Sequence, residues 1–163
     1  MRIGLVADTH DNLPLCRAAA RFLRDEAPDL VLHLGDVTSP ATLDAFEGLR
    51  AQVLVGNNDD ARALGRKAEA LGWPAPARDW SATLDGVLVA AHHGHLPPRL
   101  PGEPDVLLHG HTHRRRAETA GRTLVVNPGA LFRAPTKTIA VLELPARRVA
   151  FFEVKEEGVS PLG

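Results

Sequence analysis

The chain contains one cysteine, Cys16, among its 163 residues. A lone cysteine cannot form an intrachain disulfide, and its place in an apolar run favours a buried, unreactive thiol. No apolar run approaches the length needed to span a membrane, and Met1 leads directly into a strand-like run rather than a basic and apolar leader. These features predict a cytoplasmic protein in a reducing compartment.

The chain also lacks an excess of charge of either sign. Nineteen basic residues face twenty acidic ones, a formal charge of -1, so no overall attraction to nucleic acid or an anionic membrane is expected. Repeats and long linkers are absent too. A hydrophobic content of 44% and a charged content of 24% are typical of a globular protein. We expect one domain over residues 1–163.

Short apolar runs alternate with helix-like segments in the first half of the chain. The pattern predicts strands at residues 2–7, 29–34 and 51–55, with helices at 15–26, 41–48 and 60–71. This rhythm is typical of parallel strands joined by right-handed crossovers.

The second half is mostly strand-like. Strands are predicted at residues 82–84, 87–91, 106–108, 123–126, 138–144 and 148–154. The proline-rich segment 96–104 predicts a surface loop. Together the two halves predict an α/β fold of two packed sheets with helices outside.

Metal-binding residue types follow the ends of the predicted strands. They occur as Asp8-Thr9-His10, Gly35-Asp36, Gly56-Asn57-Asn58-Asp59, His92-His93-Gly94-His95 and His109-Gly110-His111-Thr112-His113. In open α/β sheets, ligands bind beyond the carboxyl ends of the strands. We therefore expect these clusters to meet at one rim.

The donor types indicate a hydrolytic metal site. Carboxylate, amide and imidazole groups suit Mn, Fe, Ni, Zn or Co. Asp8 and His10 are two residues apart, and so are His111 and His113. On extended backbone this spacing places both side chains of a pair on the same face, so each pair is expected to bind one metal. Glycines before the ligand candidates allow tight turns or close approach of the backbone to an ion. These glycines are Gly35, Gly56 and Gly110.

The motifs together give a family resemblance. Five blocks occur in order, followed by Asn127-Pro128-Gly129: Asp8-x-His10, Gly35-Asp36, Gly56-Asn57-x-Asp59, His93-Gly94-His95 and Gly110-His111-x-His113. In these blocks the chain resembles the calcineurin-like metallophosphoesterases, particularly their small bacterial and archaeal phosphodiesterase branch. The match runs over most of the chain and implies a four-layer αββα sandwich of two mixed sheets flanked by helices.

The resemblance also implies a dinuclear metal centre. One metal would be held by Asp8, His10, Asp36 and His113, and the other by Asp36, Asn57, His93 and His111. Asp36 suits the bridging position because a carboxylate offers two oxygens, whereas an imidazole offers one nitrogen to a metal. Two metals about 3.5–4 Å apart would share a hydroxide that attacks phosphorus in line. Manganese is the first metal we expect, with nickel, iron, zinc or cobalt as alternatives.

The chain departs from the family pattern at Asn58. Many family phosphatases carry histidine there, where it is thought to protonate the leaving group, and asparagine cannot do so. A missing general acid costs about 10²–10⁴ in rate. We name His95, two residues beyond His93, as the candidate for a phosphate contact or replacement acid, and Asn58 as the second candidate catalytic position.

Other polar residues have simpler interpretations. His33 in a strand is expected to be structural or to orient a ligand. His92 and His109 are expected to be structural or exposed, although His109 could share a face with His111. Asp60 is expected to cap the following helix, whereas Asp59 is divided between capping and support of the metal site. The run Arg114-Arg115-Arg116 either meets an anionic substrate or forms a solvated strand edge.

The resulting functional prediction is a metal-dependent phosphoric ester hydrolase acting on a small phosphate ester, with diesters favoured over monoesters. The alternatives are a non-catalytic protein-interaction scaffold and a nuclease. A eukaryotic trafficking subunit of this fold binds partner proteins but lacks a histidine at the first block, where this chain has His10. Near-zero net charge counts against a nuclease. A homo-oligomer could form through an exposed strand edge at residues 148–154.

Overall fold

The computed structural model describes residues 1–100 and 102–163. In chain order the elements are β1 (Arg2–Val6), α1 (Leu13–Glu26), β2 (Leu30–His33), the 3-10 helix η1 (Pro40–Phe46), β3 (Ala51–Val53), α2 (Ala61–Ala70), β4 (Asp79–Leu84), β5 (Val87–His92), β6 (Val106–Leu108), β7 (Arg116–Ala120), β8 (Thr123–Asn127), β9 (Thr138–Glu143), β10 (Arg148–Lys155) and β11 (Gly158–Leu162). The elements therefore follow the predicted alternation and then the predicted succession of strands.

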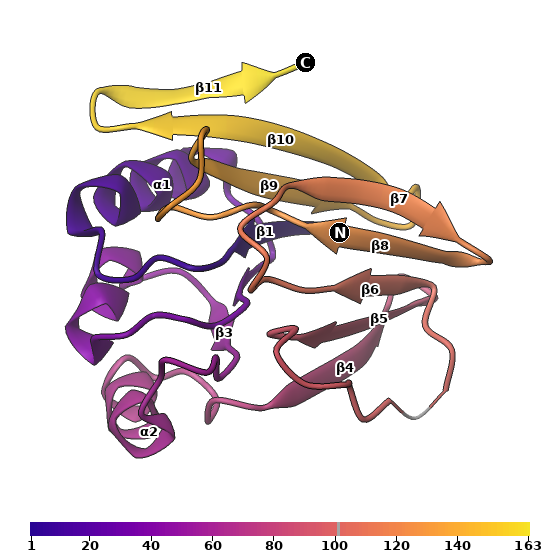
Figure 1. Cartoon of the computed structure of the whole chain (residues 1–163), viewed down its shortest axis with the longest axis horizontal. Helices are drawn as coiled ribbons and strands as arrows, with labels where there is room; N and C mark the ends of the chain where they lie inside the picture. Colours follow the sequence, from indigo (N-terminus) through magenta and orange to yellow (C-terminus); the bar gives the residue numbers. More distant parts are fainter. Residues whose placement is uncertain (101) are drawn as a thin grey trace.

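The strands form two mixed sheets (Figure 1). The six-stranded sheet has the order β11-β10-β9-β1-β2-β3, with β1, β2 and β3 parallel and β9 antiparallel to β1. The five-stranded sheet has the order β4-β5-β6-β8-β7, with β5, β6 and β8 parallel. The prediction of a sandwich of two mixed sheets flanked by helices is confirmed.

Strand β1 shows how alternation along a strand builds two separate cores. Ile3 and Leu5 belong to the apolar cluster between the two sheets, which also holds Val89 of β5. Val6 belongs to the cluster under the helices, together with Leu23 of α1. Successive side chains point to opposite faces, so a strand buried on both faces reads as a continuous apolar run.

The helices pack beside the six-stranded sheet. Helix α1 contacts η1, β10 and β11, and α2 contacts η1. Figure 1 shows both α-helices at the left of the molecule and β5, β6 and β8 further to the right. Helix α2 starts at the predicted cap, because Asp60 Oδ1 accepts hydrogen bonds from the backbone N–H groups of Arg62 and Ala63 at 2.9 and 3.0 Å. No helix in the described ranges is both long and apolar enough to cross a membrane.

Two strands escaped sequence-based prediction. Strand β7 has the sequence RAETA and is exposed throughout, so it lacks the apolar alternation of a half-buried strand. Strand β11 begins at Gly158 and contains Pro161. Because β11 pairs with β10, the expectation that residues 148–154 form a free sheet edge is wrong. Segment 96–104 contains neither helix nor strand at its described residues, as expected, and Pro101 lies outside them.

Candidate metal centre

The segments after β1, β2, β5 and β6 bring metal-binding side chains together. The ligand atoms form two groups, each with its atoms within 4.8 Å of one another: Asp8, His10 and His113 in the first, and Asp36, His93 and His111 in the second. Each group combines residues from loops that follow strands of both sheets. The expected meeting of these residues at one rim is therefore present in the fold.

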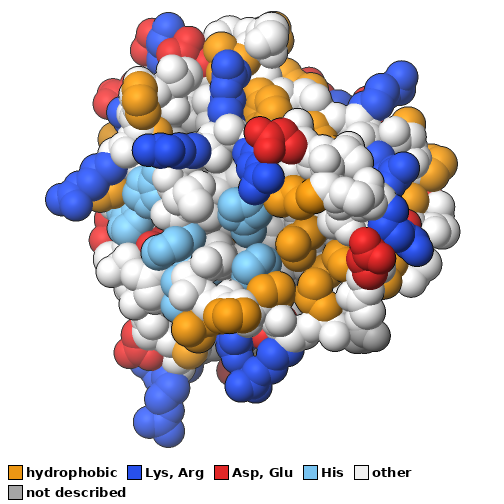
Figure 2. Space-filling view, turned by 45° about the vertical axis from the view of Figure 1, so that its right-hand side comes forward, with side chains coloured by type: hydrophobic (Ala, Val, Ile, Leu, Met, Phe, Trp, Pro, Cys, Tyr) orange, Lys and Arg blue, Asp and Glu red, His pale blue; other side chains and the backbone are white. Residues whose placement is uncertain are grey.

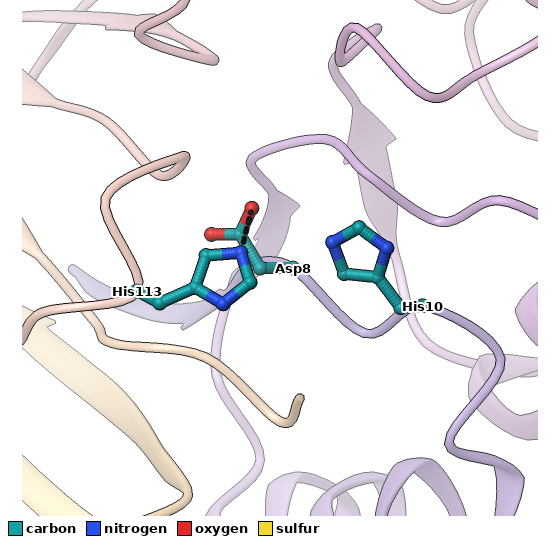
Figure 3. Close-up of side chains that lie close together, drawn as sticks. All are labelled: Asp8, His10 and His113. Carbon is teal, nitrogen blue, oxygen red and sulfur yellow. Dashed lines mark ion pairs between the residues drawn. The ribbon is translucent and has the colours of Figure 1, made fainter. Parts of the chain in front are cut away.

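The first group has two buried polar atoms without hydrogen-bond partners among the described residues, Asp8 Oδ1 and His10 Nε2. The Asp8 oxygen lies 3.5 Å from Nε2 of His113, the pair joined by the dashed line in Figure 3. Buried polar atoms normally have a partner, because leaving one unsatisfied is costly. A divalent cation fits this requirement, since a carboxylate oxygen and two imidazole nitrogens converge there.

An amide oxygen, that of Asn57, lies beside the second group. His93 Nε2 lies 3.5 Å from Oδ1 of Asp36 and 3.2 Å from Oδ1 of Asn57. The rings of His93 and His111 have their centroids 5.2 Å apart. The structure therefore places Asn57 beside the second group, as the family resemblance implies.

Asp36 lies between the two groups. Its Oδ1 faces His93 Nε2, whereas its Oδ2 lies 3.3 Å from Nε2 of His10 in the first group. One carboxylate thus directs one oxygen to each group, which is the geometry a bridging ligand requires. Asn58 holds this carboxylate, because its backbone N–H donates to Oδ1 at 2.9 Å and its amide Nδ2 donates to Oδ2 at 2.8 Å.

In His93 and in His113, a hydrogen bond at one ring nitrogen leaves the other nitrogen available to a metal. His93 Nδ1 lies 2.8 Å from the carbonyl oxygen of Leu34, and His113 Nδ1 lies 2.8 Å from that of Phe132. A carbonyl only accepts, so Nδ1 carries the proton in each neutral ring and Nε2 offers its lone pair. Both free nitrogens face carboxylates of the site. This arrangement orients the rings for metal binding.

The backbone at the ligand candidates is not extended, which corrects our explanation of their spacing. The φ angles are positive at Asp8 (51°), His10 (40°), Asp36 (55°), His111 (65°) and His113 (57°). Non-glycine residues adopt this left-handed conformation at a cost of about 1–2 kcal/mol each. The expectation that His111 and His113 bind the same metal is also wrong, because His111 belongs to the second group and His113 to the first. Turns, rather than strand alternation, aim these side chains.

Two of the three predicted glycine turns show why a side chain is excluded. A Cβ atom at Gly56 would lie 2.2 Å from Oδ1 of Asp36 and 2.4 Å from its backbone nitrogen. Gly35, immediately before Asp36, has a φ angle of +97°. The loops after β2 and β3 therefore approach each other closely at the carboxylate shared by the two groups.

The pKa values of the two carboxylates of the site are shifted in opposite directions. Burial raises the pKa of Asp8 to about 7, against the opposing attraction of His93. Burial also pushes up the pKa of Asp36, but hydrogen bonds from His93, when its ring carries a proton on both nitrogens, and from Asn58 outweigh it and leave this pKa below its ordinary value. Asp36 is therefore ionised at neutral pH, whereas a cation at Asp8 would compete with a proton.

Other histidines of the motifs have distinct surroundings. His33 is buried at the end of β2, with Nε2 3.2 Å from Oγ1 of Thr9, and burial lowers its pKa to about 4. The rings of His92 and His109 lie side by side, 6.2 Å apart, outside both metal-binding groups. The ring of His95 lies 5.3 Å from that of His93, and its Nδ1 is buried without a hydrogen-bond partner among the described residues.

Sequence reasoning missed the neighbours that hold the ligands in place. Phe132 packs its ring against His10 at 4.8 Å in addition to accepting the hydrogen bond from His113. Thr38 Oγ1 lies 3.3 Å from Nδ1 of His10. Asn127 Nδ2 donates to the carbonyl oxygen of Gly110 at 2.8 Å, which explains how the turn at residues 127–129 lies near the site. Only the last of these had a sequence signal, the family motif itself.

Asp59 supports the loop that carries Asp36. Its Oδ2 accepts the backbone N–H groups of Asp36 and Gly56 at 2.9 and 2.8 Å, and its Oδ1 accepts that of Thr38 at 2.8 Å. These bonds stabilise the left-handed backbone at Asp36 and Thr38. Asp59 therefore supports the site, whereas its neighbour Asp60 caps α2.

Replacing Asp59 with alanine is expected to weaken metal binding by about 10–100-fold, the usual effect of losing a group that orients a ligand. Calorimetric titration of metal into the metal-free protein checks this. Asp60→Ala is the matched control: it should lower the free energy of unfolding by removing the cap, yet leave metal affinity unchanged. Equal metal affinities in both variants would contradict the role assigned to Asp59.

Comparisons with known proteins relate both the sequence and the fold to phosphoesterases. Residues 1–147 match the family model for the calcineurin-like phosphoesterase superfamily domain. A phosphodiesterase of Methanocaldococcus jannaschii is 36% identical over 138 residues, which cover 79% of this chain and 83% of that protein. The structure of an archaeal phosphodiesterase matches with a TM-score of 0.84 and 28% identity, covering 94% of this chain and 99% of that chain. Vps29 from Entamoeba histolytica, solved with Zn²⁺, matches in fold with a TM-score of 0.68 and 18% identity, covering 99% of this chain and 98% of that chain.

Proposed function

Because the chain belongs to the calcineurin-like phosphoesterase superfamily, we propose that it is a dinuclear-metal-dependent phosphodiesterase acting on a small phosphate ester. The observation that carries the dinuclear assignment is the position of Asp36, which directs Oδ1 to His93 and Oδ2 to His10. A single carboxylate that faces two groups of nitrogen and oxygen donors has little use at a mononuclear site. It suits two cations a few ångströms apart.

The proposed ligand set divides around Asp36. Asp8, His10, Asp36 and His113 would hold one divalent cation, and Asp36, Asn57, His93 and His111 the other. Two bound cations supply charge neutralisation at the phosphoryl oxygens and an activated water as nucleophile. The mixed oxygen and nitrogen donors suit manganese, our first expectation, and also nickel, iron, zinc or cobalt.

The lack of an acidic group at Asn58 means that the leaving group must either depart readily or receive its proton from another side chain. Asn58 has no acidic proton to give, and its amide is already engaged as a donor to Asp36 Oδ2. The ring of His95 lies beside those of His93 and His111, with centroids at 5.3 and 6.2 Å, which makes His95 the candidate proton donor. Desolvation and these two neighbouring rings lower the pKa of His95 below its ordinary value, so its proton is easily given up. We assign His95 to contact the phosphate or protonate the leaving group.

His95→Ala is expected to reduce turnover of alkyl phosphodiesters by about 10²–10⁴-fold, the range for a lost general acid. Turnover of aryl phosphodiesters should fall much less, since an aryl oxide leaves without prior protonation. Steady-state rates on both substrate types measure the difference, with His92→Ala as the control because His92 lies outside both metal-binding groups. Unchanged turnover in His95→Ala, or an equal loss on both leaving groups, would remove the acid role.

Hydrolysis assays on metal-stripped protein test the proposed activity. The substrates are a generic aryl phosphodiester and the matching monoester, with manganese, nickel, zinc or magnesium supplied in turn. We expect metal-restored turnover with the diester favoured. A failure of every metal to restore turnover on either substrate would contradict the proposal and favour a non-catalytic scaffold. The likeness to Vps29 supports that alternative in fold only, and His10 lies among the first group of candidate ligands in this chain.

A further inference from the structure

We propose that Arg114 and Arg115 form a subsite for a second anionic group of the substrate, so that the enzyme prefers phosphodiesters that carry an additional phosphate. This inference rests on the proposed phosphodiesterase function. It names a substrate class: nucleotide-like diesters with a second phosphate group, rather than singly charged diesters.

The two arginines line the hollows beside the candidate metal centre. A cleft of 520 Å³ is lined by His109, Thr112, Arg114, Arg115, Arg116 and Glu118. A second hollow of 240 Å³ is lined by Arg114 and Arg115 together with the candidate ligand His113 and residues 135, 136 and 138. Arg114 and Arg115 are therefore shared by both hollows, and one of these hollows reaches the first metal-binding group.

The charge of these arginines is not neutralised locally. Arg116 pairs with Glu118 at 2.9 Å, whereas Arg114 and Arg115 form no ion pair within residues 1–100 and 102–163. Both are exposed, in a chain whose formal net charge is -1. The positive charge is thus a local feature of this rim. Figure 2 shows histidine side chains gathered on one face of the molecule, with Lys and Arg side chains beside them.

Packing holds two of the nearby guanidinium groups. Arg115 lies over the ring of Phe151, with its Cζ 5.8 Å from the centroid. Arg133 lies over the ring of Phe132 at 5.0 Å, and Phe132 itself contacts His10 and accepts the hydrogen bond from His113. An arginine held in this way loses less freedom when it binds an anion.

The surplus charge suits a substrate with more than one phosphate. A phosphodiester has one negative charge, which the metal centre would neutralise during hydrolysis. A further phosphate monoester adds about 1.5–2 negative charges at neutral pH and three acceptor oxygens. The planar guanidinium group binds two oxygens of a phosphate through paired N–H donors. Arg114 and Arg115 are therefore matched to a second phosphate beside the one being cleaved.

A matched pair of chromogenic substrates tests the subsite: the para-nitrophenyl ester of thymidylate, and the same ester with a further phosphate on its 3′-hydroxyl group. With the metal-loaded enzyme, kcat/KM should be about 2–30-fold higher for the doubly phosphorylated ester, the range that two exposed charge contacts provide. The ratio should fall toward one in the Arg114→Ala/Arg115→Ala double variant and on raising the salt concentration.

Arg148→Ala is the matched control, because Arg148 forms an ion pair with Glu143 and lies far from the candidate metal centre. Glu143 is paired in register with Arg2, so this ion pair lies at the end of the sheet where β1 begins, whereas the metal-binding residues follow the other ends of the strands. This variant should keep the full ratio. A ratio of one in the unaltered enzyme, or a ratio that survives in the double variant, would overturn the subsite while leaving the phosphodiesterase assignment intact. If neither ester is hydrolysed, the phosphodiesterase assignment fails instead. In that case, calorimetry measures the affinity of the metal-free protein for thymidylate and for 3′-phosphorylated thymidylate. The subsite requires the 3′-phosphorylated compound to bind more tightly, and equal affinities would overturn it.

Discussion

Asp36→Asn is expected to reduce metal-dependent hydrolysis by about 10³-fold, because it removes the charge shared by both groups of ligands. Breaking a buried, charged interaction by removing one partner costs about 3–5 kcal/mol, and each 1.36 kcal/mol corresponds to tenfold in rate. Asparagine keeps the size of the side chain but offers a metal only one oxygen. Both sites should therefore fail together, and metal analysis of the purified variant should show loss of both ions.

The matched control for this variant is Asp44→Asn, since Asp44 lies on η1 and its carboxylate pairs with Lys67 rather than with a metal-binding group. It should retain wild-type metal content and turnover. An Asp36→Asn enzyme with full activity would contradict the bridging assignment.

Gly56→Ala is expected to reduce turnover by about 10²-fold through geometry alone. The new Cβ would overlap Oδ1 of Asp36 at 2.2 Å and approach its backbone nitrogen at 2.4 Å, so the loop after β3 or the carboxylate must move. A displacement of about 1 Å at an active site can cost 10²-fold in rate. Metal affinity and kcat should fall together, and circular dichroism should show that the fold is retained.

Gly65→Ala provides the contrast within the same chain. Gly65 lies inside α2, and its added Cβ would meet nothing within 4 Å. Alanine there should raise the free energy of unfolding by about 0.5–1 kcal/mol without affecting turnover. If Gly56→Ala also proved harmless, the close packing of the Asp36 loop would not be needed for function.

The parts of the fold that sequence predicted are those with a buried apolar face. Strand β1 and helix α1 were expected close to their observed bounds, because Ile3, Leu5 and Leu23 must be buried and their spacing fixes the element type. Strand β7 has no such constraint, since all five of its residues are exposed and its pairing with β8 depends on backbone hydrogen bonds. Local pattern therefore carried no signal for it.

The candidate site shows a similar division. The residue types and their order after the strands indicated which side chains would meet, but not how. Positive φ angles at Asp8, Asp36 and His113 arise from loop geometry that depends on contacts between distant segments, such as the hydrogen bonds from Asp36 and Gly56 to Asp59. Alternation along an extended strand was the wrong local explanation, although it selected residues that do come together.

The most direct test of the dinuclear centre is manganese titration of the metal-stripped protein, followed by calorimetry and electron paramagnetic resonance. The arrangement around Asp36 predicts two equivalents bound per chain and the exchange-coupled spectrum of a carboxylate-bridged manganese pair. That coupling should disappear in Asp36→Asn. A single equivalent with the spectrum of isolated Mn²⁺ ions would contradict the account.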